Sequence, residues 1–222
     1  MYLRLSHTLD SEIPTYKRAD GFSSKPGMSM SKGDFANTNY FTMMNHVGTH
    51  IEAPHHFLNN MKTIDSFDIS AFVFEKPTLI DIPKGDAELI DRSDLMKARD
   101  KISGKDIILI RTGFGDLQSN DRQRYEFSGP GFSAEAAGYL QEFRDLRALG
   151  IDFISLNSPK FEEDGYRAHR ILLSKEVRSG FFIIEDMDLR QDFKSLKRLI
   201  VAPLYVKGFD SVPCTVIAET LE

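Results

Sequence analysis

Histidines and one glutamate are concentrated in a short stretch of the chain. Four of the six histidines among the 222 residues lie between positions 46 and 56, in the segment NHVGTHIEAPHHF that begins at Asn45. Imidazole nitrogens and carboxylate oxygens are ligands that Zn²⁺ and Mn²⁺ accept, and two histidines with one acid are a common set. His46, His50 and Glu52 supply this set. We therefore predict a divalent metal site here, although isolated histidines more often only satisfy the backbone of a polar loop.

The spacing within the segment indicates a turn or an extended conformation. Gly48, Thr49 and Pro54 disfavour a continuous helix. His50 and Glu52 are two positions apart, so a strand would place both side chains on one face. The segment also differs from the zincin motif, because no glutamate lies between the first two histidines to act as the general base. A different group must therefore transfer the proton.

His56 is the candidate for proton transfer. It follows Pro54, which fixes the local backbone, and histidine titrates near neutral pH. We predict that His56 stands beside the metal ion as a general acid or base, whereas its neighbour His55 must point elsewhere.

Composition and charge exclude several classes of protein. The formal net charge is −5 with both signs intermingled, so no basic block is present to follow a nucleic-acid backbone. The single cysteine, Cys214, cannot form an internal disulfide, which fits a reducing compartment. The sequence shows no signal-peptide pattern and no apolar run near the ~18 residues of a membrane span. We therefore expect a cytoplasmic protein without nucleic-acid or membrane partners, folded as one domain over residues 1–222.

Apolar patterns predict the elements that must position these residues. Short apolar runs bounded by turn residues predict strands at 72–74, 78–82, 107–110, 151–156, 181–184, 199–206 and 214–218. Helical periodicity predicts helices at 94–101, 166–177 and 133–149, the last with Ser133 as N-cap and Gly150 as the stop. The segment 21–34, rich in Gly, Ser and Pro, predicts a long surface loop of the kind that can form a lid. Since strands outnumber helices and alternate incompletely with them, the class is α/β or α+β with a mixed sheet.

The histidine segment resembles the signature H-x-G-T-H-x-D-x-P-x-H-F of the cyclase, or bacterial kynurenine formamidase-like, family of metal-dependent hydrolases. The matching residues are His46, Gly48, Thr49, His50, Pro54, His56 and Phe57. Other segments match in the family's order: Leu5-Ser6-His7, Pro14-Thr15-Tyr16, Arg111-Thr112-Gly113, Gly150-Ile151-Asp152, and Ala168-His169 followed by Ile183-Ile184-Glu185. The resemblance thus spans nearly the whole chain.

The resemblance implies a fold and a set of ligands. The fold is a single swivelling β/β/α domain of cyclase type, and the assembly is a homo-oligomer, either a dimer or a tetramer. Two overlapping sets of ligands follow by position. The first set is His46, His50, Glu52 and Glu185, and the second is Glu52, His169 and Glu185. The implied cofactor is Zn²⁺, one or two ions per chain, or alternatively Mn²⁺.

The resemblance also assigns residues around the metal. His56 falls on the family's general acid or base, and Tyr16 falls on an aromatic residue, usually Trp, that lines the substrate site of formamidases. Glu52 replaces the signature's aspartate with a side chain that is one methylene longer. The interval from His169 to Glu185 is longer than in the formamidases, which could reflect an added helical turn.

These residues predict a hydrolase of small-molecule carbon–nitrogen bonds other than peptide bonds. The ion would activate water and polarise the carbonyl, and His56 would protonate the departing nitrogen. The metal ion and His56 can act on any carbonyl, so substrate selectivity must come from the residues that form the wall of the substrate site. Tyr16 and the loop 21–34 are the candidates for this wall. An arylformamidase-like or cyclic-amide substrate is the first hypothesis.

Two other functions stay open. The same ion could act as a Lewis acid in a cyclase or lyase acting on a polyketide-like or sugar-acid substrate, and such a reaction would consume no water. The third hypothesis is a non-catalytic protein that binds metal or a small molecule. A titratable His56 beside the ligands argues against it.

Overall fold

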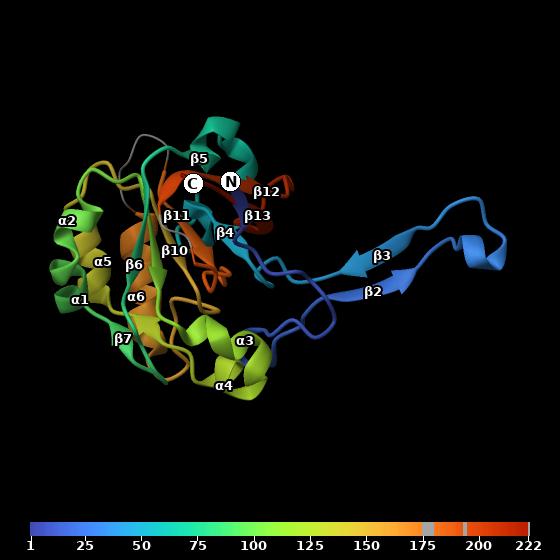
Figure 1. The fold of residues 1–222 in the computed structure, drawn as a ribbon, viewed down its shortest axis with the longest axis horizontal. Coiled ribbons are helices and arrows are strands. Elements are labelled where there is room, and N and C mark those ends of the chain that lie inside the picture. Colours follow the sequence, from blue (N-terminus) through green and yellow to red (C-terminus); the bar gives the residue numbers. More distant parts are fainter. Residues whose placement is uncertain (175–179, 193–194, 222) are drawn as a thin grey trace.

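One large mixed sheet forms the centre of the molecule (Figure 1). The computed structural model describes residues 1–174, 180–192 and 195–221. The strands of the sheet are ordered β5-β12-β13-β4-β11-β10-β8-β6, and β1 pairs with β13 outside this path. Their bounds are Tyr2–Arg4 (β1), His50–Glu52 (β4), Val73–Phe74 (β5), Pro77–Asp81 (β6), Ile107–Arg111 (β8), Ala148–Ile151 (β10), Phe182–Glu185 (β11), Leu196–Pro203 (β12) and Ser211–Thr220 (β13). The predicted mixed α/β class is confirmed.

The sheet changes from parallel to antiparallel at β4. Strands β6, β8, β10 and β11 are parallel to one another, whereas β4 is antiparallel to both β11 and β13. Parallel strands are covered on both faces, which explains the continuous apolar run of β8. Ile108 and Ile110 belong to the core on one face, and Ile107 and Leu109 belong to the core on the other.

Helices cover one face of the sheet, and the second core lies on the opposite face. The helices are α1 (Arg92–Lys97), α2 (Arg99–Ile102), α3 (Leu117–Asn120), α4 (Arg122–Phe127), α5 (Ala134–Leu140) and α6 (Glu162–Leu173). A separate parallel pair joins β7 (Leu89–Ile90) to β9 (Gly131–Phe132). The second core contains Phe67, Phe72 and Phe182. None of the helices in the described part of the chain combines the length and the apolar character that crossing a bilayer requires.

The predicted helix at 133–149 is wrong beyond Leu140. Ser133 caps α5 as predicted, because its hydroxyl accepts a hydrogen bond from the backbone of the first turn. The chain then turns and enters β10, and Gly150 lies inside this strand instead of ending a helix. A Cβ at Gly150 would come within 2.5 Å of the buried Met187 Sδ. Burial between two parallel neighbours therefore overrides the helical periodicity of the sequence.

The other predicted elements agree with the structure to different degrees. The predicted strand 151–156 leaves the sheet after Ile151, whereas the remaining strand predictions overlap observed strands. The predicted helix 94–101 is divided into α1 and α2. The helix predicted at 166–177 is observed as α6, which begins earlier, at Glu162, and ends at Leu173. Positions 175–177 of that prediction lie outside the described residues.

The segment 21–34, predicted as a loop, begins a two-stranded arm instead. Strand β2 (Ser23–Pro26) pairs antiparallel with β3 (Asn39–Thr42), and the 3₁₀ helix η2 (Met30–Lys32) lies between them. Figure 1 shows the arm projecting away from the large sheet. Both strands are exposed along their whole length. Exposed strands show no alternation of apolar and polar residues, so the sequence carries no strand pattern here.

Candidate metal centre

Strand β4 carries two of the predicted ligands in the middle of the sheet. His50 and Glu52 flank Ile51 and therefore point to the same face, as predicted for an extended segment. Antiparallel pairing with β11 places His50 opposite Glu185, the last residue of that strand. All three polar side chains are buried. The register of the sheet thus joins the distant glutamate to the histidine segment.

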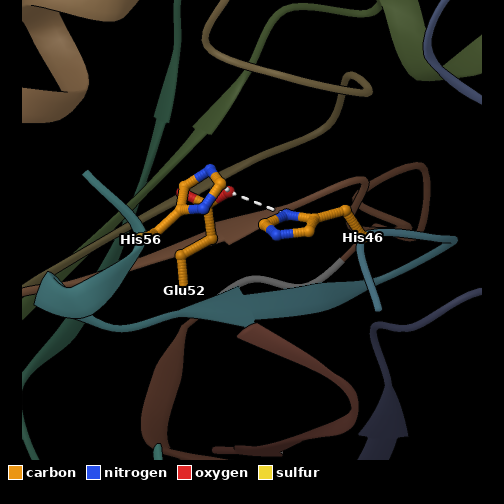
Figure 2. Close-up of side chains that lie close together, drawn as sticks. All are labelled: His46, Glu52 and His56. Atoms are coloured by element: carbon orange, nitrogen blue, oxygen red, sulfur yellow. Dashed lines mark ion pairs between the residues drawn. The ribbon is translucent and has the colours of Figure 1, made fainter. Parts of the chain in front are cut away.

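His46 and His56 flank β4 on either side. His46 lies in the turn before the strand, where Gly48 has a φ of 64°, a conformation that glycine adopts without strain. His56 ends the 3₁₀ helix η3 (Pro54–His56), which Pro54 begins. The ring centroids of His46 and His56 are 4.3 Å apart. Figure 2 shows both rings beside the carboxylate of Glu52.

Helix α6 supplies the fourth imidazole, that of His169. The buried residues of α6 lie on one face: Gly165, Ala168, His169, Leu172 and Leu173. The Nε2 atom of His169 is 3.4 Å from Glu52 Oε2 and 3.3 Å from Glu185 Oε1. The structure therefore brings together all five residues that were predicted as ligands, and His56 with them.

Glu52 occupies the centre of this cluster. Its Oε1 atom is 3.2 Å from His46 Nδ1 and 3.3 Å from His56 Nε2. The same oxygen is 3.7 Å from His50 Nε2, while Oε2 faces His169. The longer side chain that replaces the signature's aspartate thus reaches all four imidazoles.

The loop after β10 orients Glu185. The backbone N–H of Leu156 donates a hydrogen bond of 2.8 Å to Glu185 Oε1, and the hydroxyl of Ser155 lies 3.3 Å from the same oxygen. Both residues belong to the stretch that was predicted to continue the strand. Its departure from the sheet gives the buried carboxylate a backbone donor.

The imidazole protons of the two most buried histidines point away from the centre. His50 Nδ1 donates to the carbonyl oxygen of Gly48, and His169 Nδ1 donates to that of Gly165, both at 2.8 Å. A neutral imidazole carries one proton, so each Nε2 presents a lone pair to the glutamates. His50 Nε2 and Glu52 Oε2 are buried and have no hydrogen-bond partner among the described residues. Acceptors that converge in a buried site fit a cation between them.

The two buried glutamates favour positive charge on the histidines around them. Burial lowers the pKa of His50, but the neighbouring carboxylates of Glu185 and Glu52 outweigh burial and raise that pKa to about 10. Burial also lowers the pKa of His169, but Glu52 and Glu185 outweigh burial, Glu52 most strongly, and raise that pKa to about 10. Burial raises the pKa values of both glutamates, but the neighbouring histidines outweigh it and hold both below the ordinary range. A divalent ion can replace the protons of the histidines as the source of this charge.

Two overlapping groups of ligand atoms share Glu52. The atoms of His46, Glu52 and His56 lie within 4.8 Å of one another, and so do the atoms of His50, Glu52 and Glu185. The first group contains His56, which was predicted to transfer a proton rather than to bind the ion. The geometry by itself therefore permits either role for this residue.

Asp210 belongs to the site and was not predicted. Its Oδ2 atom is 2.7 Å from His56 Nδ1 and 3.1 Å from His46 Nε2. Burial raises the pKa of the Asp210 carboxyl, but hydrogen bonds from the two histidines outweigh burial and lower the pKa below its ordinary value. In the sequence, Asp210 is a single aspartate before a strand, far from either histidine. Only the pairing of Ser211 with Glu52 in the sheet reveals its position.

Tyr16 and the segment 21–34 were the predicted substrate wall. The hydroxyl of Tyr16 donates to Glu162 at the start of α6, at 3.0 Å, and its ring packs against the helix-side core. Burial and Glu162 raise the pKa of Tyr16. The segment 21–34 leads into the arm, which points away from the sheet (Figure 1). Phe57, which sequence analysis assigned to no role at the site, stacks on His169 with ring centroids 4.6 Å apart.

Known proteins resemble this chain in both sequence and fold. The model of the family described as putative cyclase matches residues 3–158. The chain is 28% identical over 222 residues to a kynurenine formamidase of Bacillus thuringiensis subsp. konkukian (strain 97-27), which covers 99% of this chain and 98% of that protein. It is 29% identical over 177 residues to cyclase-like protein 1 of Arabidopsis thaliana, covering 76% of this chain and 66% of the relative. A solved structure of isatin hydrolase A from Labrenzia aggregata, bound to benzyl benzoate, is similar with a TM-score of 0.84 and 22% identity, covering 100% of this chain and 94% of that chain.

Proposed function

Because this chain belongs to the putative cyclase family, we propose that it is a metal-dependent hydrolase of small-molecule amides, with aryl formamides and cyclic amides as the first substrates to test. The observation that carries the proposal is the convergence of four imidazoles on two buried carboxylates. Similarity to kynurenine formamidase over nearly the whole chain supports an amide substrate.

The proposed ligands are those predicted from the sequence: His46, His50, Glu52, His169 and Glu185. Histidine nitrogens mixed with carboxylate oxygens suit Zn²⁺, and Mn²⁺ is the alternative. When bound, such an ion would polarise the substrate carbonyl and lower the pKa of a water molecule toward about 7. The remaining chemistry is the work of the protein's own side chains.

We propose His56 as the group that protonates the departing nitrogen. Its side chain is 25% exposed, whereas those of His50 and His169 are 2% and 1% exposed, so His56 faces the side from which a substrate can approach. Its Nδ1 is engaged by Asp210, and its Nε2 points toward Glu52 at the centre of the site. An amine is a poor leaving group without a proton, and a histidine in this place can supply one.

Aromatic side chains beside the centre support an aromatic substrate. Phe57 packs edge-on against His56 and face-on against His169. Tyr166 is 43% exposed on α6, with its ring 6.1 Å from that of Phe57. Together they offer an apolar surface within reach of the metal centre. We propose Tyr16 as a further part of this wall.

The test is a comparison of three substrates. We expect a higher kcat/KM on N-formylkynurenine and on isatin than on an aliphatic amide, and Tyr16→Ala should lower only the first two values. Equal or faster turnover of the aliphatic amide would contradict the aromatic assignment. Product formation without consumption of water would instead indicate a cyclase or lyase.

We also propose that the chain forms a homo-oligomer. The arm exposes Phe35, Tyr40 and Phe41, and an isolated two-stranded hairpin is only marginally stable in water. A second copy of the chain could cover these rings. Light scattering should give the mass of a dimer or tetramer, and the mass of a single chain would contradict the proposal.

A further inference from the structure

Asp210 lies between two histidines of the site and contacts both with one oxygen. The same Oδ2 atom accepts from His46 Nε2 at 3.1 Å and from His56 Nδ1 at 2.7 Å. These two histidines come from opposite ends of β4, one before and one after the strand. One carboxylate oxygen of Asp210 thus contacts the imidazole rings of both His46 and His56.

Asp210 is itself held in place by the segment it contacts. Its Oδ1 atom accepts a hydrogen bond of 2.9 Å from the side-chain amide nitrogen (Nδ2) of Asn45. The same nitrogen also donates to the backbone carbonyl oxygen of Ser211. The backbone carbonyl of Asp210 accepts from the N–H of Ala53 at 2.8 Å. These contacts leave Oδ2 directed at the two imidazoles.

The chemistry of a carboxylate decides where the imidazole protons lie. An ionised carboxylate only accepts hydrogen bonds, so the nitrogens that face Oδ2 must carry the protons. In the neutral rings the lone pairs are then on His46 Nδ1 and His56 Nε2. Both of these atoms face Glu52, at 3.2 Å and 3.3 Å.

We propose that Asp210 is a positioning residue that holds the protons of His46 and His56 on the ring nitrogens facing away from the metal centre. His46 Nδ1 is thereby free to bind the ion, and His56 Nε2 is free to exchange a proton with the substrate. The inference rests on the proposed function for these two roles. Backbone carbonyls do the same for His50 and His169, so Asp210 is where a side-chain substitution can change the tautomers.

Asp210→Asn is the informative substitution because it keeps the size and shape of the side chain. The amide of Asn45 donates to the Oδ1 position, so the carbonyl oxygen of the new side chain would occupy that position and its NH₂ would face the histidines. An NH₂ group donates, and it would draw the protons of both rings to the opposite nitrogens. His46 Nδ1 and His56 Nε2 would then be blocked together.

The first readout is the tautomer of each ring, which needs neither substrate nor metal. Long-range ¹H–¹⁵N spectra of the metal-free protein, at a pH where the imidazoles are neutral, should show protons on His46 Nε2 and His56 Nδ1. In Asp210→Asn both assignments should be reversed. Asp86→Asn, at an exposed aspartate paired with Arg124, is the matched control and should leave them unchanged.

The second readout is binding of Zn²⁺ alone. Loss of a group that orients a ligand weakens metal affinity by about 10- to 100-fold, and we expect this loss in Asp210→Asn with an unchanged far-ultraviolet spectrum. At saturating Zn²⁺, kcat should still fall while KM changes little. If Asp210→Asn does not fold, Asn45→Ala should give a smaller change in the same direction.

The outcomes separate this inference from the proposed function. Wild-type tautomers and Zn²⁺ affinity in Asp210→Asn would overturn the positioning role even if the enzyme hydrolyses amides. Reversed tautomers and weakened Zn²⁺ binding would support that role even if no amide is a substrate.

Discussion

Gly165 on α6 predicts an unusual response to a common substitution. Glycine to alanine inside a helix normally stabilises it by about 0.5–1 kcal/mol, because glycine has the higher conformational entropy when unfolded. At Gly165, however, a Cβ would lie 2.5 Å from the Cα of Asn157, about 1 Å short of the ordinary contact range that begins at 3.4 Å. The obstacle is backbone, so α6 or the loop that carries Asn157 must move.

The expected magnitude follows from the two opposing effects. Overpacking costs about 1–3 kcal/mol, which exceeds the gain in helix propensity, so Gly165→Ala should lower the free energy of unfolding. For a protein of this size, each kcal/mol corresponds to about 2–4 °C in Tm. A shift of α6 would also displace His169 relative to Glu52 and Glu185, and a misplacement of about 1 Å can cost about 10² in kcat.

Gly138 on α5 is the matched control. It is exposed on its helix, and a Cβ there would meet no atom within 4 Å apart from its chain neighbours and the backbone of its own helix. Urea unfolding should show Gly138→Ala more stable than the wild type and Gly165→Ala less stable, and calorimetry should show weaker Zn²⁺ binding only in Gly165→Ala. If Gly165→Ala were stabilising and bound Zn²⁺ normally, the proposed packing of α6 against the site would be refuted.

Three further predictions concern the site and the surrounding charges. His50→Ala should abolish both metal binding and hydrolysis yet leave folded protein, as circular dichroism would verify; an active metal-free variant would contradict its role. His56→Asn should keep the metal, measured by elemental analysis, and lower kcat by about 10² to 10⁴; loss of metal would make His56 a ligand. Burial raises the pKa of Glu126, but hydrogen bonds from Arg122 and Arg18 outweigh it and lower that pKa below 4.5. The stability advantage of the wild type over Glu126→Gln should therefore be full above pH 4.5 and decrease as the pH falls below it, and a Tm difference that is independent of pH would contradict this.

The part of the site that is local in sequence could be predicted from the sequence. His46, His50 and Glu52 lie within one short segment, and their residue types alone indicate a metal site. A turn or an extended conformation was predicted there because Gly48, Thr49 and Pro54 disfavour a continuous helix. His169 and Glu185 required the resemblance to a family, because a helix-surface histidine and a carboxylate at a strand end are each common.

The remaining features depend on tertiary contacts that no local pattern encodes. Asp210 reaches the histidines only through the register of β13 against β4. The region around Gly150 has helical periodicity, yet burial between β8 and β11 makes it a strand. The exposed strands of the arm lack the apolar alternation by which a strand is recognised.

The most direct test of the metal-dependent amide hydrolase is a titration of metal into the metal-free protein. Hydrolysis of N-formylkynurenine would be followed as Zn²⁺, or in a parallel series Mn²⁺, is added in fractions of the protein concentration. If the six converging side chains form the metal centre, the protein should show no turnover before metal is added. The rate should then rise with each addition and reach a plateau at one or two ions per chain. Full turnover by the metal-free protein, or a rise with no plateau near stoichiometric metal, would contradict the proposed centre.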